Sequence, residues 1–241
     1  MKEARYFYVP QAIERNELPT EEATHALRVL RLKPGDELFL MDGEGVFYEA
    51  HVTQADKHCY YEIDKALPQS KTWSAHMHLG IAPTKMMERI EWLAEKATEI
   101  GFDELSFLHC KFSERKTLRA DRVEKIVVSA AKQSRKPFMP QVHELTPFSQ
   151  FIDESEEGHR YIAHCYDEIE RVDFFNELNQ LTDDAPITIL VGPEGDFSID
   201  EVKLAMAKGY KSISLGKSRL RTETAGLYAC LLYTSDAADD L

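Results

Sequence analysis

The stretch PITILVGPEGDFSIDEVKLAMAKGYKSISLG, residues 186–216, determines the fold class of this chain. It begins with a nearly continuous apolar run, which is typical of a strand buried on both faces of a sheet. Ser198 and Glu201 then have the spacing of a capping box at a helix start, and Gly209 stands where a glycine ends a helix. Because a second short strand, SISLG, follows, the stretch predicts the strand–helix–strand unit of a parallel α/β sheet.

The same alternation extends upstream to residue 75. Apolar segments at 75–83, 104–110 and 161–165 read as strands, and helical periodicity marks 85–100 and 119–134, with a further helix at 169–180. Strands that alternate with helices over this length predict an open, doubly wound parallel sheet.

The first 68 residues have a different pattern. Segments 5–9, 37–43, 46–54 and 58–67 are rich in aromatic and β-branched residues and are bounded by turns. One helix, at 19–32, interrupts them, with Thr20 as its expected N-cap. Several short strands and one helix predict a small β-barrel. The polar segment 67–74 reads as a linker, so we expect domains at 1–70 and 73–241.

Composition is that of a soluble globular protein of 241 residues, with 43% hydrophobic and 29% charged residues. No apolar run is long enough for a membrane span and the N-terminus lacks a signal-peptide core, so a cytoplasmic location is expected. The net charge of −13 is uneven: 153–201 carries fifteen acids and two cations, whereas 111–136 carries nine cations and three acids. A basic face beside an acidic one is compatible with RNA binding.

Several familiar motifs are absent. GKS at 216–218 resembles the end of a phosphate-binding P-loop, but that loop needs a glycine at position 211, where this chain has lysine. The chain has no GxGxxG, and its four cysteines have no metal-binding spacing. His76 and His78 alternate on one strand, but the sequence offers no third ligand beside them. We therefore expect no metal.

Two glycine turns remain, and each follows a predicted sheet strand. They are ILVGPEGDFS at 189–198 and ISLGKSRLRTETA at 213–225. Ligands of open α/β sheets bind at the carboxyl ends of strands, and glycine permits close approach of the backbone to a ligand. Two arginines, Arg219 and Arg221, flank an apolar leucine beside the acidic Glu223, a combination that fits a pocket facing an anionic substrate.

These two turns closely resemble the paired C-terminal motifs of the ribosomal RNA small subunit methyltransferase E family. Further similar segments lie, in the family's order, at 25–45 (HALRVLRLKPGDELFLMDGEG), 85–101, 111–116 (KFSERK) and 130–142 (AAKQSRKPFMPQV). One departure is Asp196, where the family commonly has a glycine in GPEGG. Another is the tail after Cys230, LLYTSDAADDL, which lacks the apolar period of the family's longer amphipathic helix.

The resemblance implies a PUA-like β-barrel followed by a SPOUT-superfamily methyltransferase domain with a trefoil knot. It implies a homodimer that transfers a methyl group from S-adenosylmethionine to N3 of a specific uridine in 16S rRNA of the small ribosomal subunit. Carried onto this chain, the cofactor-binding residues are His164, Leu190, Gly192, Glu194, Gly195, Leu215, Gly216, Leu220 and Thr224, with Arg221 also in the pocket.

For catalysis we expect Arg221 to stabilise charge on the uracil and Glu223 to act as a positioning group or proton acceptor. RNA phosphates would meet cations on two surfaces: Arg28, Arg31 and Lys33, and then Lys111, Arg115, Lys116, Lys132, Arg135 and Lys136. Two alternatives are a non-enzymatic RNA-binding module, which would bind no S-adenosylmethionine, and a nucleotide-phosphate enzyme, which would bind ATP through GKS.

Overall fold

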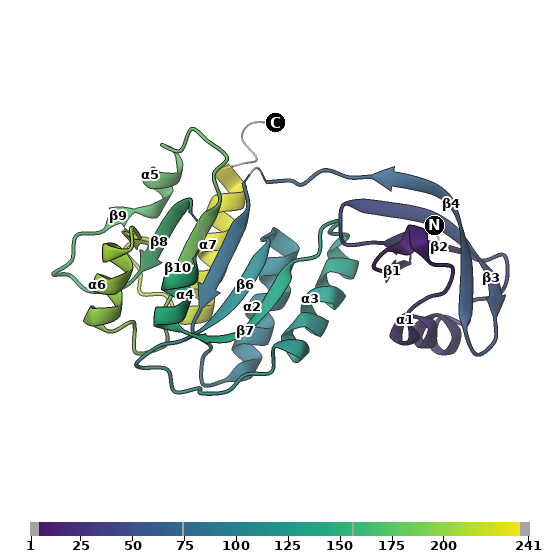
Figure 1. Ribbon diagram of the computed structural model, residues 1–241, viewed down its shortest axis with the longest axis horizontal. Helices are drawn as coiled ribbons and strands as arrows, with labels where there is room; N and C mark the ends of the chain where they lie inside the picture. The colour runs from purple at the N-terminus through teal and green to yellow at the C-terminus, as the bar shows by residue number, and fades with distance from the viewer. Residues whose placement is uncertain (1–4, 74, 156, 237–241) are drawn as a thin grey trace. The chain divides into compact units, whose positions relative to one another are not determined.

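The computed structural model describes residues 5–73, 75–155 and 157–236, and these divide into two compact units (Figure 1). Unit 1 comprises residues 1–71 together with 128–139, and unit 2 comprises 72–127 together with 140–241. The sequence did not indicate that 128–139 packs with the N-terminal residues. Among the described residues, no helix combines the length and apolar character needed to cross a membrane.

Unit 1 is built on a four-stranded sheet in the order β1-β2-β3-β4. Its strands are β1 (Tyr6–Tyr8), β2 (Glu37–Met41), β3 (Val46–Ala55) and β4 (Cys59–Pro68). β1 pairs with β2 in parallel, whereas β2, β3 and β4 are antiparallel neighbours. The four strands predicted from the sequence match these elements to within about two residues.

The predicted helix of unit 1 is present but begins differently. It runs as α1 (Thr20–Thr24) and continues as the π-helical turn η2 (His25–Val29), after a short 3₁₀ turn η1 (Ala12–Glu14). Pro19, not Thr20, is the N-cap residue, so the predicted N-cap was wrong. Thr20 is the first helical residue, and its carbonyl accepts a hydrogen bond from the Thr24 hydroxyl.

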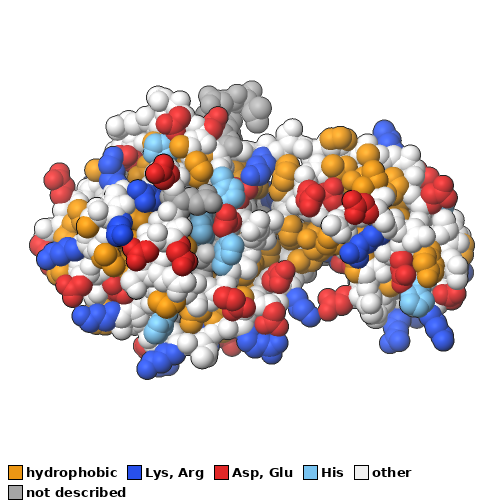
Figure 2. Space-filling view, in the orientation of Figure 1, with side chains coloured by type: hydrophobic (Ala, Val, Ile, Leu, Met, Phe, Trp, Pro, Cys, Tyr) orange, Lys and Arg blue, Asp and Glu red, His pale blue; other side chains and the backbone are white. Residues whose placement is uncertain are grey.

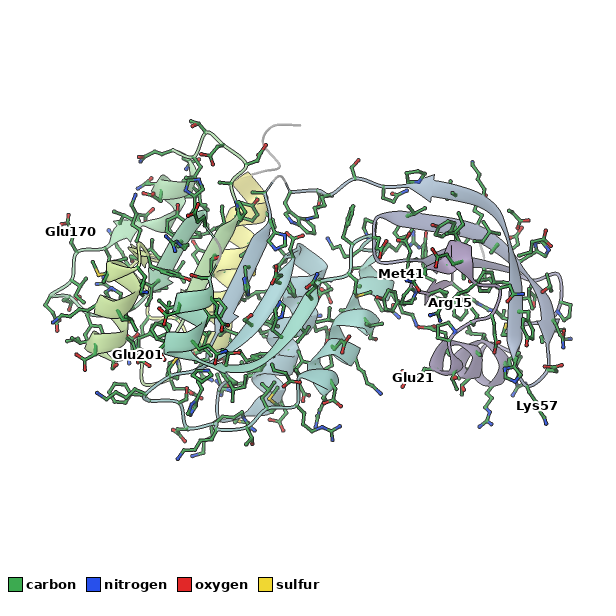
Figure 3. The ribbon with its side chains drawn as sticks, viewed as in Figure 1. Arg15, Glu21, Met41, Lys57, Glu170 and Glu201 are labelled. Atoms are coloured by element: carbon green, nitrogen blue, oxygen red, sulfur yellow. The ribbon has the colours of Figure 1, made fainter. Side chains whose placement is uncertain are left out.

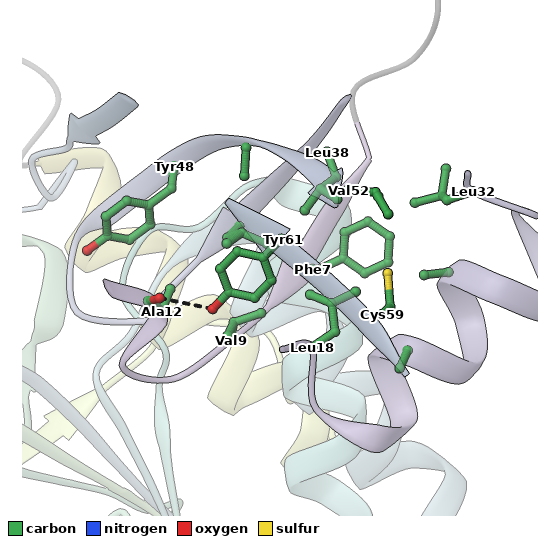
Figure 4. Packing of buried hydrophobic residues seen from close by; sticks show 14 residues of the cluster. Phe7, Val9, Ala12, Leu18, Leu32, Leu38, Tyr48, Val52, Cys59 and Tyr61 are labelled. Carbon is green, nitrogen blue, oxygen red and sulfur yellow. Dashed lines mark hydrogen bonds between the residues drawn. The ribbon is translucent and has the colours of Figure 1, made fainter. Parts of the chain in front are cut away.

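A continuous apolar core fills unit 1. It gathers residues from the strands and from the helical segment between β1 and β2, as Figure 4 shows for Phe7, Leu18, Leu38 and Tyr61. The Tyr61 hydroxyl donates to the Ala12 carbonyl at 2.9 Å, which satisfies a polar atom inside this core.

Residues 128–139 complete a smaller cluster within unit 1. Ala131 is fully buried and belongs to one apolar cluster with Met41 and Phe47. The Gly45 N–H donates to the Pro137 carbonyl at 3.0 Å, and the Met139 N–H donates to the Gly43 carbonyl at 2.8 Å. This backbone pairing attaches the segment to the hairpin turn between β2 and β3.

Unit 2 contains a seven-stranded, wholly parallel sheet in the order β7-β6-β5-β10-β8-β11-β9. The strands are β5 (Met77–Ile81), β6 (Glu104–His109), β7 (Gln141–Pro147), β8 (His159–Ala163), β9 (Val172–Asp173), β10 (Ile187–Val191) and β11 (Lys211–Ser214). The expected doubly wound parallel sheet is therefore confirmed, although the sequence analysis missed β7 and β9.

Helices cover both faces of this sheet (Figure 1). They are α2 (Met87–Ile100), α3 (Ala120–Ser134), α4 (Phe148–Glu154), α5 (Phe174–Leu178), α6 (Ile199–Ala207) and α7 (Thr222–Asp236). Helices α2 and α7 pack together, and α7 lies against β5 and β10. Gly226 makes that approach possible, because a Cβ there would lie 3.0 Å from the Ile81 side chain.

The stretch 186–216 folds as predicted. Every residue of β10 is buried. The Ser198 side chain accepts the Glu201 N–H while the Glu201 carboxylate accepts the Ser198 N–H, so the capping box at the start of α6 is confirmed (Figure 3 labels Glu201). Gly209 follows the helix with φ of +91°, a conformation that favours glycine.

The last helix includes residues 231–236 of the tail that follows Cys230. α7 runs to Asp236, and Tyr233 is buried within it. The Tyr233 hydroxyl donates to the Ala75 carbonyl at 3.0 Å and accepts the Ala75 N–H. The tail after Cys230 thus makes specific contacts just before β5, while residues 237–241 lie outside the described residues.

Candidate active site

A cavity of about 580 Å³ opens at the carboxyl ends of β8, β10 and β11, where α7 begins. We call it the strand-end cavity. It lies where ligands bind in open α/β sheets, and its volume falls within the range of small-molecule sites. Both glycine turns singled out in the sequence contribute to its wall. Its lining combines apolar side chains, such as Val191, Leu215 and Leu220, with carboxylates and arginines.

The first turn, after β10, is tightly folded. A Cβ at Gly192 would lie 2.9 Å from the Phe197 backbone nitrogen, so a larger residue does not fit. Asp196 has φ of +67°, a left-handed conformation that favours glycine. Its carboxylate accepts the Cys165 N–H at 2.8 Å and thereby ties the loop after β8 to this turn.

The second turn, after β11, is joined to the first by a buried hydrogen bond. The Thr222 hydroxyl donates to the Gly192 carbonyl at 3.0 Å. Gly216 lies on the cavity wall with φ of +106°, which accounts for glycine at that position. Two stretches separated by thirty residues therefore form one structural unit around the cavity.

An ion pair joins α2 to the start of α7 at the cavity. The Arg89 guanidinium donates to Glu223 Oε1 at 2.8 Å, and Glu223 is only 7% exposed. Both side chains line the cavity. The sequence analysis missed Arg89, because it precedes its partner by 134 residues and carries no motif of its own.

His164 is buried at the end of β8 and is held in one tautomer. The Tyr166 N–H donates to Nδ1 at 3.1 Å, and Nε2 lies 2.6 Å from the Ser212 hydroxyl. Since Nδ1 accepts a hydrogen bond, the proton of the neutral ring is assigned to Nε2. Burial lowers the pKa of His164 below its ordinary value, which favours the neutral ring.

Most residues predicted for the cofactor and for catalysis meet at this cavity. Its wall includes His164, Gly192, Glu194, Leu215, Gly216, Leu220, Arg221 and Glu223. Three predicted residues lie outside it. Leu190 is fully buried in β10 and points toward Gly80, Gly195 faces Phe112, and Thr224 is exposed on α7.

The predicted RNA-binding cations are distributed over both units and have unlike surroundings. Five of them are exposed and lie outside the β-strands: Arg28, Arg31, Lys33, Lys111 and Lys116. Arg115 instead donates to the backbone carbonyls of Thr84 and Lys85, beside the cavity.

The three cations at the end of α3 are engaged within unit 1. Lys132 pairs with the buried Glu22 at 2.6 Å, and the Arg135 guanidinium lies over the Tyr6 ring, 5.4 Å from its centroid. Partial burial lowers the pKa of Lys136. Lys132 and Arg135 thus have partners within unit 1, and the RNA-binding role expected of all three cations stays a prediction.

Comparison with known families identifies the class of this α/β protein as an RNA methyltransferase. The family model of the RNA methyltransferase domain matches residues 71–234, and that of the RNA methyltransferase PUA domain matches residues 18–60. The former covers more than half of the chain.

Relatives identify the particular family. Ribosomal RNA small subunit methyltransferase E of Aquifex aeolicus is 31% identical, with 82% of this chain and 85% of that protein covered. A probable rRNA methyltransferase from Porphyromonas gingivalis has a similar structure, with a TM-score of 0.89 and 40% identity over 98% of this chain and all of that one. This chain belongs to the ribosomal RNA small subunit methyltransferase E family.

One solved member of that family carries the cofactor. The enzyme from Neisseria gonorrhoeae, bound to S-adenosylmethionine, is 26% identical to this chain, with a TM-score of 0.79 and 95% of each chain covered.

Proposed function

We propose that the chain binds S-adenosylmethionine in the strand-end cavity and transfers its methyl group to N3 of a uridine in small-subunit rRNA. The observation that carries this proposal is the hydrogen bond between Thr222 and Gly192, which joins the family's two motifs around one cavity. Membership of the rRNA methyltransferase family supports the reaction class, and the resemblance described above supports the choice of uridine N3.

The residues of the cavity fit S-adenosylmethionine. Apolar side chains and loop backbone suit an adenine ring, and the carboxylates of Glu194, Asp196 and Glu223 suit a cofactor with a cationic sulfonium. When bound, the cofactor supplies a methyl group that is already activated. The protein then has to align that methyl group with the base and to favour the deprotonated base.

Two residues take distinct parts in this mechanism. Arg221 is exposed in the cavity, where its guanidinium can stabilise the negative charge that develops on the uracil oxygens as N3 loses its proton. Glu223 is bound to Arg89 through Oε1, and this ion pair favours a positioning role over that of proton acceptor.

Several wider features belong to the same proposal. Unit 1 would bind RNA as a PUA-like domain, and its sheet would close toward a barrel. Unit 2 would contain the trefoil knot of the SPOUT superfamily. We place the enzyme in the cytoplasm and expect a homodimer in solution, which light scattering on the purified chain tests directly.

The test compares ligands and variants. Calorimetry should detect binding of S-adenosylmethionine but not of ATP, and nucleoside mass mapping should find N3-methyluridine in rRNA of small subunits treated with the enzyme. Arg221→Ala should lower turnover about 100-fold or more, as for the loss of an oxyanion donor. Lys217→Ala is the matched control, because Lys217 is an exposed cation of the same loop outside the cavity wall. Full turnover by Arg221→Ala would overturn its role.

A further inference from the structure

A second cluster of reactive side chains lies on the sheet of unit 2, away from the strand-end cavity. It comprises His76, His78, Glu104 and His143, and we call it the histidine cluster. Figure 2 shows histidine side chains gathered on the face that carries β6 and β7. The sequence offered no third ligand for His76 and His78, but the fold supplies two, because β5, β6 and β7 are neighbouring strands.

The glutamate is the centre of the cluster. His76 Nε2 lies 2.7 Å from Glu104 Oε1, and His143 Nε2 lies 2.6 Å from Oε2. His78 Nδ1 is 3.8 Å from Oε2. Two imidazoles and one carboxylate, those of His78, His143 and Glu104, have ligand atoms that all lie within 4.8 Å of one another.

These distances are close to what a zinc ion requires. Bonds of about 2.0–2.2 Å in a tetrahedral arrangement place neighbouring ligand atoms about 3.4 Å apart. Small side-chain rotations are enough to reach that spacing from 4.8 Å or less. The backbone need not move, because all three residues belong to adjoining strands of one parallel sheet.

The surroundings orient two of the three ligands, His78 and Glu104. His78 Nε2 lies 2.8 Å from the Ser106 hydroxyl, which leaves Nδ1 directed to the glutamate. His76 holds the other carboxylate oxygen of Glu104. Such partners behind the ligands are typical of metal sites, where they fix ring orientation and raise ligand basicity.

Access is also adequate. His143 and His76 are 40% and 38% exposed, whereas His78 and Glu104 are 19% and 20% exposed. Two ligands are therefore held on the protein side, while the other side of the cluster opens to solvent. An ion can enter from that side, and a water molecule can complete its coordination.

We propose that the histidine cluster is a zinc site. Its ligands are His78 Nδ1, His143 Nε2 and Glu104 Oε2, and water takes the fourth position. Two histidines and one carboxylate are a known ligand set for Zn²⁺. The ion would join β5, β6 and β7. None of these ligands lines the strand-end cavity, so the proposal stands apart from the methyl-transfer function.

Cobalt and zinc titrations of the full chain test the proposal. After chelator treatment, Co²⁺ should bind with a stoichiometry of one per chain and give the visible absorption of a tetrahedral site, and Zn²⁺ should displace it. His143→Ala removes a ligand and should weaken binding of either ion by about 100-fold or more. This is more than the loss expected when only a residue that orients a ligand is removed. His76→Ala should weaken it by about 10- to 100-fold and keep the cobalt spectrum.

The control is His159→Ala, which removes another histidine of unit 2 that contacts a carboxylate, that of Asp183 at 2.8 Å. It should bind Co²⁺ as the unmodified chain does. If His78→Ala does not fold, two other variants still test whether the cluster binds the ion. They are His143→Ala, at a more exposed position, and the isosteric Glu104→Gln. Lack of Co²⁺ binding by the unmodified chain, or unchanged binding by His143→Ala, would show that the cluster is only a hydrogen-bonded network. Binding of S-adenosylmethionine should be equal with and without zinc.

Discussion

The strand-end cavity and the histidine cluster belong to the same sheet but are assembled in different ways. The cavity depends on two turns about thirty residues apart, in which Gly192 and Gly216 are required by local geometry and Thr222 joins one turn to the other. The histidine cluster brings together residues from 76 to 143, near the starts of β5, β6 and β7. A site built from local turns leaves a pattern in the sequence, whereas a site built across strands leaves single residues that nothing in their neighbourhood explains.

The first test of this difference between a site built from local turns and a site built across strands is a substitution in the first glycine turn, where we expect a large loss of stability and affinity. A Cβ at Gly192 would meet the Phe197 backbone nitrogen at 2.9 Å, and backbone cannot give way cheaply. Gly192→Ala should distort the turn at a cost of about 1–3 kcal/mol, the usual range for such strain. Because Gly192 lies on the cavity wall, affinity for S-adenosylmethionine measured by calorimetry should fall by about 5- to 150-fold, the equivalent of that cost.

Gly195→Ala is the matched control for this change. Its Cβ would lie 3.3 Å from the Phe112 side chain, which is exposed and can adjust. We expect little change in affinity. Equal losses for both variants would contradict the distinction between a glycine on the cavity wall and one outside it.

The ion pair at the start of α7 gives an effect of similar size, and it joins segments that are distant in the sequence. Arg89→Met leaves the buried Glu223 without its partner and should destabilise the chain by about 1.5–3 kcal/mol, as for other hydrogen bonds to charged groups. Urea denaturation measures the loss.

Combining Arg89→Met with Glu223→Gln decides whether the two residues act as a pair. The double variant should lose less than the sum of the single losses, by about 0.5–3 kcal/mol. Additive losses would mean that each residue has its own role at the cavity.

The limits of prediction from the sequence follow from these contacts. The apolar run of β10, the capping box of Ser198 and Glu201 and the glycine turns all obey local rules, so the parallel sheet and most of the cavity wall could be predicted. Leu190 was placed in the site although its side chain is in the core, because alternation along a fully buried strand leaves no sign of side-chain direction. Arg89 and His143 depend on which strands and helices become neighbours, and single-sequence patterns do not contain that information.

The basic residues give a third, smaller test, now on RNA. Lys116 is exposed, whereas Lys132 forms an ion pair with Glu22 within unit 1. Lys116→Met should reduce the salt dependence of rRNA binding by about one unit of slope, the effect of losing one phosphate contact. Lys132→Met should leave the slope unchanged and lower thermal stability instead. Filter binding over a range of salt concentrations measures the slopes of both variants, and thermal unfolding measures the stability. A reduced slope for Lys132→Met would show that Lys132 also contacts RNA.

The smallest expected effect is on the pH dependence of stability, and it again contrasts the cavity with another region. Burial lowers the pKa of His164, so its contribution to stability is complete above the unfolded value of about 6.5 and is lost as the pH falls. The hydrogen bond to Asp64 raises the pKa of the exposed His51, so its contribution is complete below about 6.5 and is lost as the pH rises.

The two substitutions should therefore change the acid side of the stability curve in opposite directions. His164→Asn should make the free energy of unfolding fall less between about pH 7 and pH 5, because a group that resists protonation has been removed. His51→Asn should make the same fall slightly steeper. Denaturant unfolding at several pH values measures both slopes. A change of the same sign in both variants would mean that the environment of His164 does not keep its ring neutral, and the tautomer assigned at the cavity would have to be abandoned.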